Sequence, residues 1–190
     1  DKWEPGISDL HQVCKEHPEW IAAWISRAWA YRNLFRLSML SEENYYRIAV
    51  ADLARAFELE PDRIDLRLYR GKLLFDVAQA EGSGTPKWIL NLDRESLFGE
   101  ALNDFRKVIH QHKDVVQAWF YKGMCLTQYG KYLKHDGRDP MPLWNEARKD
   151  FSEAIETKLW ERVAKANWQS FKEARKFARS LGLKTQGEWV

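Results

Sequence analysis

The sequence has little cysteine, glycine or proline, and almost no net charge. Two cysteines among 190 residues are too few for a small secreted domain held together by disulfides. The 30 basic and 28 acidic side chains leave a formal charge of only +2, and 14% of the residues are aromatic. Disordered chains are poor in aromatic residues and strongly charged, so this composition predicts a folded globular chain.

The sequence also lacks a long hydrophobic run. The best candidate, residues 20–37, is interrupted by three arginines, whereas a membrane span needs about 18 or more uninterrupted apolar residues. We therefore expect no membrane partner. The opening residues, Asp-Lys-Trp-Glu-Pro, resemble neither a signal peptide nor a presequence. We expect a cytoplasmic piece of a longer protein, in which Cys14 and Cys125 are small apolar residues inside helices.

Apolar and small residues instead recur with the period of an α-helix along most of the chain. Three segments share the spacings 0, +4, +7 and +8, and they begin at Ala49, Ala101 and Ala147. The segments before them share the spacings 0, +4 and +7, and they begin at Trp24, Arg67 and Trp119. Two kinds of helix therefore alternate along the chain, which is typical of a repeat protein.

Small residues hold matching positions in these alternating helices. Ala28, Gly71 and Gly123 each fall four residues after the start of the first kind of helix. Glycine inside a helix costs about 1 kcal/mol relative to alanine. The two glycines therefore indicate close packing against the alanines that begin the second kind of helix.

This alternation resembles the tetratricopeptide repeat, whose pattern is Trp-x2-Leu-Gly-x2-Tyr followed by Ala-x3-Phe-x2-Ala and a proline. The best match is AVADLARAFELEPDRIDLRLYRG, residues 49–71, with five residues in family positions: Ala49, Leu53, Ala56, Pro61 and Gly71. The resemblance extends from about residue 6 to about residue 159. It implies an all-α fold, a right-handed α-solenoid of antiparallel helix pairs.

We predict a single repeat domain over residues 1–190. Its parts are a leading half-repeat (6–17), three repeats (21–61, 64–113 and 116–159) and a C-terminal capping helix (160–182). The repeat starts are 43, 52 and 46 residues apart instead of the family's 34. The excess falls between the two helices of each repeat, in insertions at 33–43, 81–96 and 129–144. We expect Trp88, Ile89 and Leu90 of the second insertion to fold back onto the helices or to meet a partner.

The titratable side chains form no convincing catalytic or metal site. His11, Cys14 and His17 are spaced three residues apart, but their pattern favours surface histidines and a packed cysteine. His135 and its neighbouring aspartates favour a solvated turn. The excess of basic over acidic residues between 145 and 184 is small for a nucleic-acid binder. We therefore predict no enzyme, no catalytic residue, no metal, no cofactor and no nucleic-acid partner.

The resemblance implies a binding groove lined by the first helix of each repeat. The residues that match the family's groove positions include Asp76 and nine proposed contact residues: Ile25, Trp29, Arg32, Leu68, Lys72, Phe75, Phe120, Met124 and Gln128. The lysine and asparagine pattern with which some members hold a C-terminal carboxylate is absent here. An aromatic and apolar groove favours an apolar or amphipathic segment of a protein partner.

Three interpretations of function follow. The first is a non-catalytic module that binds a partner peptide or helix in its groove, within a larger protein. The second is an intramolecular scaffold or regulatory domain whose groove is filled by its own insertion, residues 81–96. The third is a helical-repeat enzyme subunit, because residues 23–32, AWISRAWAYR, are faintly similar to the alpha subunit of protein prenyltransferases.

Overall fold

The computed structural model describes residues 4–37, 43–80 and 87–156, and every regular element in these ranges is an α-helix. The predicted all-α fold is therefore confirmed for this part of the chain. The capping helix predicted at 160–182 lies outside the described residues. The chain divides into two compact units, 1–104 and 105–190, and the boundary falls within helix α6 (Arg94–Gln111).

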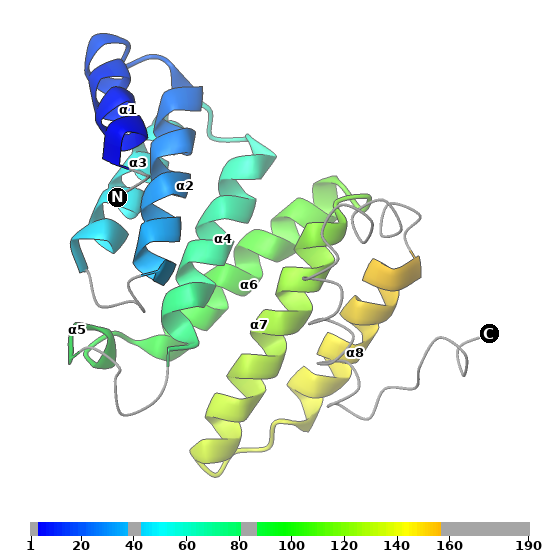
Figure 1. Ribbon diagram of the computed structural model, residues 1–190. Helices are drawn as coiled ribbons and strands as arrows, with labels where there is room; N and C mark the ends of the chain where they lie inside the picture. The colour runs from blue at the N-terminus through cyan, green and yellow to red at the C-terminus, as the bar shows by residue number, and fades with distance from the viewer. Residues whose placement is uncertain (1–3, 38–42, 81–86, 157–190) are drawn as a thin grey trace. The chain divides into compact units, whose positions relative to one another are not determined.

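The first unit is built around a pair of long helices. Helix α2 packs along α3, α1 packs on α2, and α4 contacts both α2 and α3 (Figure 1). The helices of this unit before α6 are α1 (Glu4–Glu16), α2 (Ile21–Leu37), α3 (Glu43–Leu59), α4 (Ile64–Ala78) and the short α5 (Lys87–Leu90). The pairing of α2 with α3 is the helical hairpin expected for the first repeat.

The core of this unit comes from the small and apolar positions of the predicted helices. Ala28 of α2 and Ala49 of α3 are both buried in it. Around them lie the larger buried side chains Phe35, Leu53, Leu66, Leu73 and Val77. Helix α3 ends at Leu59, two residues before Pro61, because the residue before a proline is disfavoured in the helical region.

The second insertion folds back onto this unit. Ile89 of α5 is fully buried in the core, and the Trp88 ring lies 5.9 Å from the Phe35 ring and 5.5 Å from the Tyr46 ring. Residues 81–86 lie outside the described ranges. Residues 33–37 of the first insertion extend α2 and Glu43 begins α3, while residues 38–42 lie outside the described ranges.

The second unit contains the last part of α6 and a hairpin of α7 (Val116–His135) and α8 (Met141–Glu156), which pack along each other (Figure 1). Gly137 ends α7 with φ +74°, a conformation that glycine adopts without strain. The Asp139 carboxylate accepts a hydrogen bond from Met141 N at 2.9 Å and so caps the start of α8. The third insertion therefore lengthens α7 and forms this turn.

Two glycines allow α7 and α8 to approach each other. A Cβ atom on Gly123 would lie 2.9 Å from the ring of Phe151, and one on Gly130 would overlap the indole of Trp144. The indole Nε1 donates to the Thr127 carbonyl at 3.3 Å. The sequence predicted a packing role for Gly123 but not for Gly130.

The repeat is also visible in hydrogen bonds at the start of each hairpin. In each case, a side chain near the start of the helix donates to the backbone carbonyl six residues earlier. The three bonds are Trp24 Nε1 to Pro18 O at 3.0 Å, Arg67 Nη2 to Pro61 O at 3.2 Å, and Trp119 Nε1 to Lys113 O at 3.0 Å.

A buried ion pair recurs at matching positions as well. Each cation lies three residues after Trp24, Arg67 or Trp119. Each aspartate lies three residues after Ala49, Ala101 or Ala147, the alanines with which the spacings 0, +4, +7 and +8 begin. The pairs are Arg27–Asp52 at 2.7 Å, Arg70–Asp104 at 2.7 Å and Lys122–Asp150 at 2.8 Å. Structural repetition therefore extends to polar contacts, while the repeat borders stay a prediction.

The third pair predicts a pH effect on stability. Burial raises the pKa of Asp150 from its ordinary 3.8 to about 6, and Lys122 only partly opposes this. Because the folded-state pKa is the higher one, the protonated carboxyl favours folding, and this contribution is lost as pH rises through about 6. From pH 7 to pH 4.5, wild type should gain about 2 kcal/mol of unfolding free energy relative to Asp150→Asn. Urea unfolding of both proteins at the two pH values measures this. An equal difference at both pH values would contradict it.

Candidate functional site

The first unit contains an open apolar pocket of about 400 Å³ between α1, α2 and α4. Its lining residues are Gly6, Ile7, Leu10, Ile25, Ser26, Trp29, Ala30 and Tyr69. The Trp29 side chain is 42% exposed, which is unusual for a tryptophan that lines an apolar hollow. A Cβ atom at Gly6 would meet nothing within 4 Å, so the pocket has free space beside this residue.

The face of α2 that lines this pocket continues into charged residues. Ile25, Trp29, Arg32 and Arg36 follow one another at helical spacing, so they share one side of α2. Arg32 and Arg36 both approach Asp76 of α4, with Arg32 Nη2 at 2.7 Å from one carboxylate oxygen and Arg36 Nε at 3.9 Å from the other.

Lys72, one helical turn before Asp76 on α4, completes an ionic cluster with Arg32, Arg36 and Asp76. Three of the four members are buried, and Arg36 is the exposed one, with 55% of its side chain accessible. The Lys72 ammonium lies 5.8 Å from the Tyr69 ring centroid. Because Tyr69 also lines the pocket, the apolar pocket and the ionic cluster adjoin each other.

Burial perturbs the pKa values of two groups in this cluster. It raises the pKa of Asp76, although Arg32, Arg36 and Lys72 all act in the opposite direction. The pKa of Lys72 is lowered from 10.5 to about 8, first by burial and then by Arg32, while Asp76 acts in the opposite direction. Both shifts reflect the cost of keeping a charged group where little water can solvate it.

The structure places the predicted groove residues of the first unit in three settings. Ile25 and Trp29 line the pocket, while Arg32 and Lys72 belong to the ionic cluster. Phe75 is only 2% exposed and lies in the core, so it offers no open surface. Leu68 is half-buried on α4 and is absent from the pocket lining.

The three predicted residues of the second unit, Phe120, Met124 and Gln128, lie along α7 and are half-buried. The Phe120 ring packs 6.1 Å from the Phe151 ring and 5.5 Å from the Tyr121 ring. Phe120 therefore contributes at least in part to packing within its own unit.

Sequence reasoning missed several contributors to the site. Gly6, Ile7 and Leu10 of α1 form one wall of the pocket, although α1 was expected only as a leading half-repeat. Arg36 also belongs to the site. Its position four residues after Arg32 was the available signal, because that spacing puts both arginines on one face.

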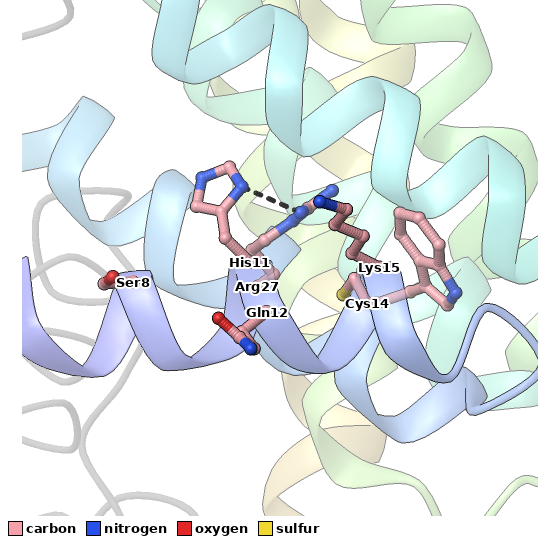
Figure 2. A pocket seen from close by; sticks show the side chains of 7 residues that line it. Ser8, His11, Gln12, Cys14, Lys15 and Arg27 are labelled. Carbon is pink, nitrogen blue, oxygen red and sulfur yellow. Dashed lines mark hydrogen bonds between the residues drawn. The ribbon is translucent and has the colours of Figure 1, made fainter.

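A second, more polar hollow of about 450 Å³ lies between α1 and α2 (Figure 2). Arg27 donates to both Asp52 oxygens and also approaches His11 Nδ1 at 3.0 Å. A guanidinium can only donate, so His11 Nδ1 accepts and the imidazole proton resides on Nε2, 2.8 Å from Tyr31 Oη. His11 is therefore an exposed residue whose two ring nitrogens are both hydrogen-bonded within the protein.

The cysteine beside this hollow is not exposed as a nucleophile. Cys14 is buried, and burial raises the pKa of its thiol, against the opposing effect of Arg27. Within residues 4–37, 43–80 and 87–156, no three histidine, cysteine, aspartate or glutamate side chains converge as metal ligands. In the same ranges, no helix combines the length and the apolar character that a membrane crossing requires.

The fold and its recurring contacts define an all-α protein built from repeated helical hairpins. No protein-family model matches the sequence, and no curated protein matches it either. Among solved structures, the chain is similar to the one described as "Crystal structure of MamA protein". The similarity has 16% sequence identity and a TM-score of 0.39, and it covers 88% of this chain and 87% of that chain. With so low a score, we take no residue role from it.

Proposed function

We propose that this chain is a non-catalytic module that binds a peptide or helix of a protein partner at the pocket between α1, α2 and α4. The observation that carries the proposal is Trp29, which stands 42% exposed beside an apolar hollow of about 400 Å³. Tryptophans in such positions often dominate the energy of protein interfaces. Ile7, Leu10 and Ile25 would supply the apolar surface around the inserted side chain.

This proposal is favoured over an intramolecular scaffold by the position of the second insertion. In its described part, Trp88 packs against Phe35 and Tyr46, and Ile89 enters the core. Neither Trp88 nor Ile89 lines the pocket that contains Trp29. The positions of Trp88 and Ile89 therefore favour an open pocket over one filled by the second insertion.

The test is selection of a displayed library of random linear peptides on the wild-type protein. Peptides from this selection should bind Trp29→Ala about 30-fold more weakly, because hot-spot tryptophans contribute about 2 kcal/mol or more. Fluorescence anisotropy with labelled synthetic peptides measures the affinities.

Trp20→Ala is the matched control, because Trp20 is also exposed, at 55%, but does not line the pocket. It should leave peptide affinity unchanged. The proposal fails if no peptide is enriched, or if a folded Trp29→Ala variant binds the selected peptides as well as wild type does. Circular dichroism establishes that both variants are folded.

A further inference from the structure

Helix α1 forms one wall of the pocket and is only lightly held. Ile7 and Leu10 line the pocket beside Trp29, and α1 packs on α2. Within residues 6–16, the part of α1 whose burial the structure describes, Cys14 is the only buried side chain. Helices with so few buried contacts open at a low cost in free energy. A modest change in the contacts between α1 and α2 therefore decides whether this wall is in place.

His11 links α1 to α2 through both of its ring nitrogens. Nε2 donates to Tyr31 Oη at 2.8 Å, and Nδ1 accepts from Arg27 Nη1 at 3.0 Å (Figure 2). His11 follows Ile7 by four residues, so the two side chains share one side of α1. The imidazole is also exposed, so protons from the solvent reach it.

Arg27 is held in the orientation that points toward His11. Its Nε and Nη2 donate to the two Asp52 oxygens at 2.9 Å and 2.7 Å. Its guanidinium carbon also lies 4.9 Å from the centroid of the Trp24 ring. Because Asp52 is only 2% exposed, breaking its pairing with Arg27 would leave a buried charge without its partner. Arg27 Nη1 therefore remains directed at His11 Nδ1.

The surroundings of His11 do not favour a positive charge on its ring. The described titratable groups around it come from three helices: Cys14 and Lys15 of α1, Arg27 and Tyr31 of α2, and Asp52 and Tyr45 of α3. Asp52 is the one carboxylate among them, and Arg27 already occupies both of its oxygens. Burial raises the pKa of the Cys14 thiol and of the Tyr31 hydroxyl, so both groups are neutral. An added proton would therefore place a third positive charge beside those of Arg27 and Lys15.

We infer that His11 makes the docking of α1 on α2, and with it peptide binding at the pocket, sensitive to pH. Histidines ordinarily change charge between about pH 5 and pH 8. A protonated Nδ1 is a donor that faces the fixed donor Arg27 Nη1, so the hydrogen bond is lost and two positive charges oppose each other. This inference rests on the proposed function and adds its regulation: the α1 wall is in place at neutral pH and is released in mildly acidic solution.

The first measurement is the affinity of selected peptides that contain no histidine, at pH 7.5 and at pH 5.5. Wild type should bind about tenfold more weakly at pH 5.5, because only a fraction of the molecules then retains the α1 wall. His11→Gln should bind equally well at both pH values, within about twofold. A glutamine amide donates and accepts as a neutral imidazole does, but it takes up no proton in this range.

The second measurement follows α1 without any peptide. Hydrogen exchange detected by mass spectrometry gives the protection of the α1 amides at the same two pH values, corrected for the intrinsic effect of pH on exchange. In wild type, this protection should fall about tenfold from pH 7.5 to pH 5.5, because the docked helix opens more often. In His11→Gln, it should stay the same.

His17→Gln is the matched control, because the His17 side chain is 57% exposed, follows the end of α1 and lines neither hollow. It should keep the pH dependence of wild type. The inference fails, while the proposed function stands, if Trp29-dependent peptides bind wild type equally at both pH values, or if His11→Gln loses as much affinity as wild type. Unchanged protection of α1 in wild type also contradicts the inference. If no peptide depends on Trp29, the proposed function fails, and hydrogen exchange alone decides whether α1 docking responds to His11.

Discussion

Replacing Asp104 by alanine should lower the free energy of unfolding by about 3 kcal/mol, the cost typical of removing one partner from a buried ion pair. Asp104 is 0% exposed, and its two oxygens accept from Arg70 Nε and Nη2, each at 2.7 Å. Arg67 Nη1 lies 3.9 Å away. Without the carboxylate, both guanidinium groups would face an apolar methyl group, and Arg67 is too enclosed to regain full hydration. Urea unfolding followed by circular dichroism measures the change.

Asp114→Ala is the control for the Asp104 substitution, because the Asp114 side chain is 70% exposed. Surface substitutions of this kind usually change stability by less than about 0.5 kcal/mol. A loss below about 1 kcal/mol for Asp104→Ala would show that the ion pair is not a main determinant of stability. Asp104→Asn, which retains the size but not the charge, should fall between alanine and wild type.

The helical hairpins could be predicted from the sequence because helix packing depends on small and apolar residues at fixed spacings. Ala28 and Ala49 fall at these spacings, and both are buried where α2 packs along α3. Gly123 also falls at such a spacing, and in the second unit it lies against the Phe151 ring. Apolar periodicity is a strong signal because burial depends on which side of a helix a residue occupies.

The recurring ion pairs were not predicted from the sequence. Asp52, Asp104 and Asp150 repeat at spacings as regular as those of the alanines before them, so the signal was present in the sequence. Aspartates are rarely buried without a partner, so apolar periodicity alone predicts that they face the solvent. Only the three-dimensional pairing with a cation of the preceding helix explains why these aspartates are buried.

The candidate site was predictable only in part. Helical spacing identified Ile25 and Trp29 as residues of the site, because residues four apart lie on the same face of α2. The contribution of α1 depends on how α1 packs on α2, which no local pattern specifies. The burial of Arg32 and Lys72 also depends on the packing of α2 against α4, so sequence spacing could place them in a groove but could not show that they form an ionic cluster.

Replacing Lys72 by methionine should raise the free energy of unfolding at pH 7 by about 3 kcal/mol. Lys72 is buried, and burial lowers its pKa to about 8 from an ordinary 10.5. Folding must therefore bring a charged ammonium into a place that disfavours it. Methionine retains a long, flexible side chain of similar volume and carries no charge, and Asp76 still has Arg32 and Arg36 as partners.

The pH dependence separates this effect from ordinary packing. Because the folded-state pKa is lower than the unfolded one, the unfolded state binds more protons between pH 8 and pH 10.5, and wild-type stability rises with pH in that window. The advantage of Lys72→Met should therefore shrink as pH rises from 8 toward 10, which urea unfolding at both ends would show. Lys107→Met, at an exposed position of α6, controls for the general effect of removing a lysine.

A gain in stability from Lys72→Met would bear on function as well. Buried charges that lower stability are often retained where a binding site needs them. Because the ionic cluster adjoins the pocket that contains Trp29, the same variant should then bind the selected peptides more weakly. If Lys72→Met were instead less stable than wild type at pH 7, the interactions of Lys72, among them those with Asp76 and Tyr69, would outweigh its desolvation. The lysine would then be a structural member of the cluster.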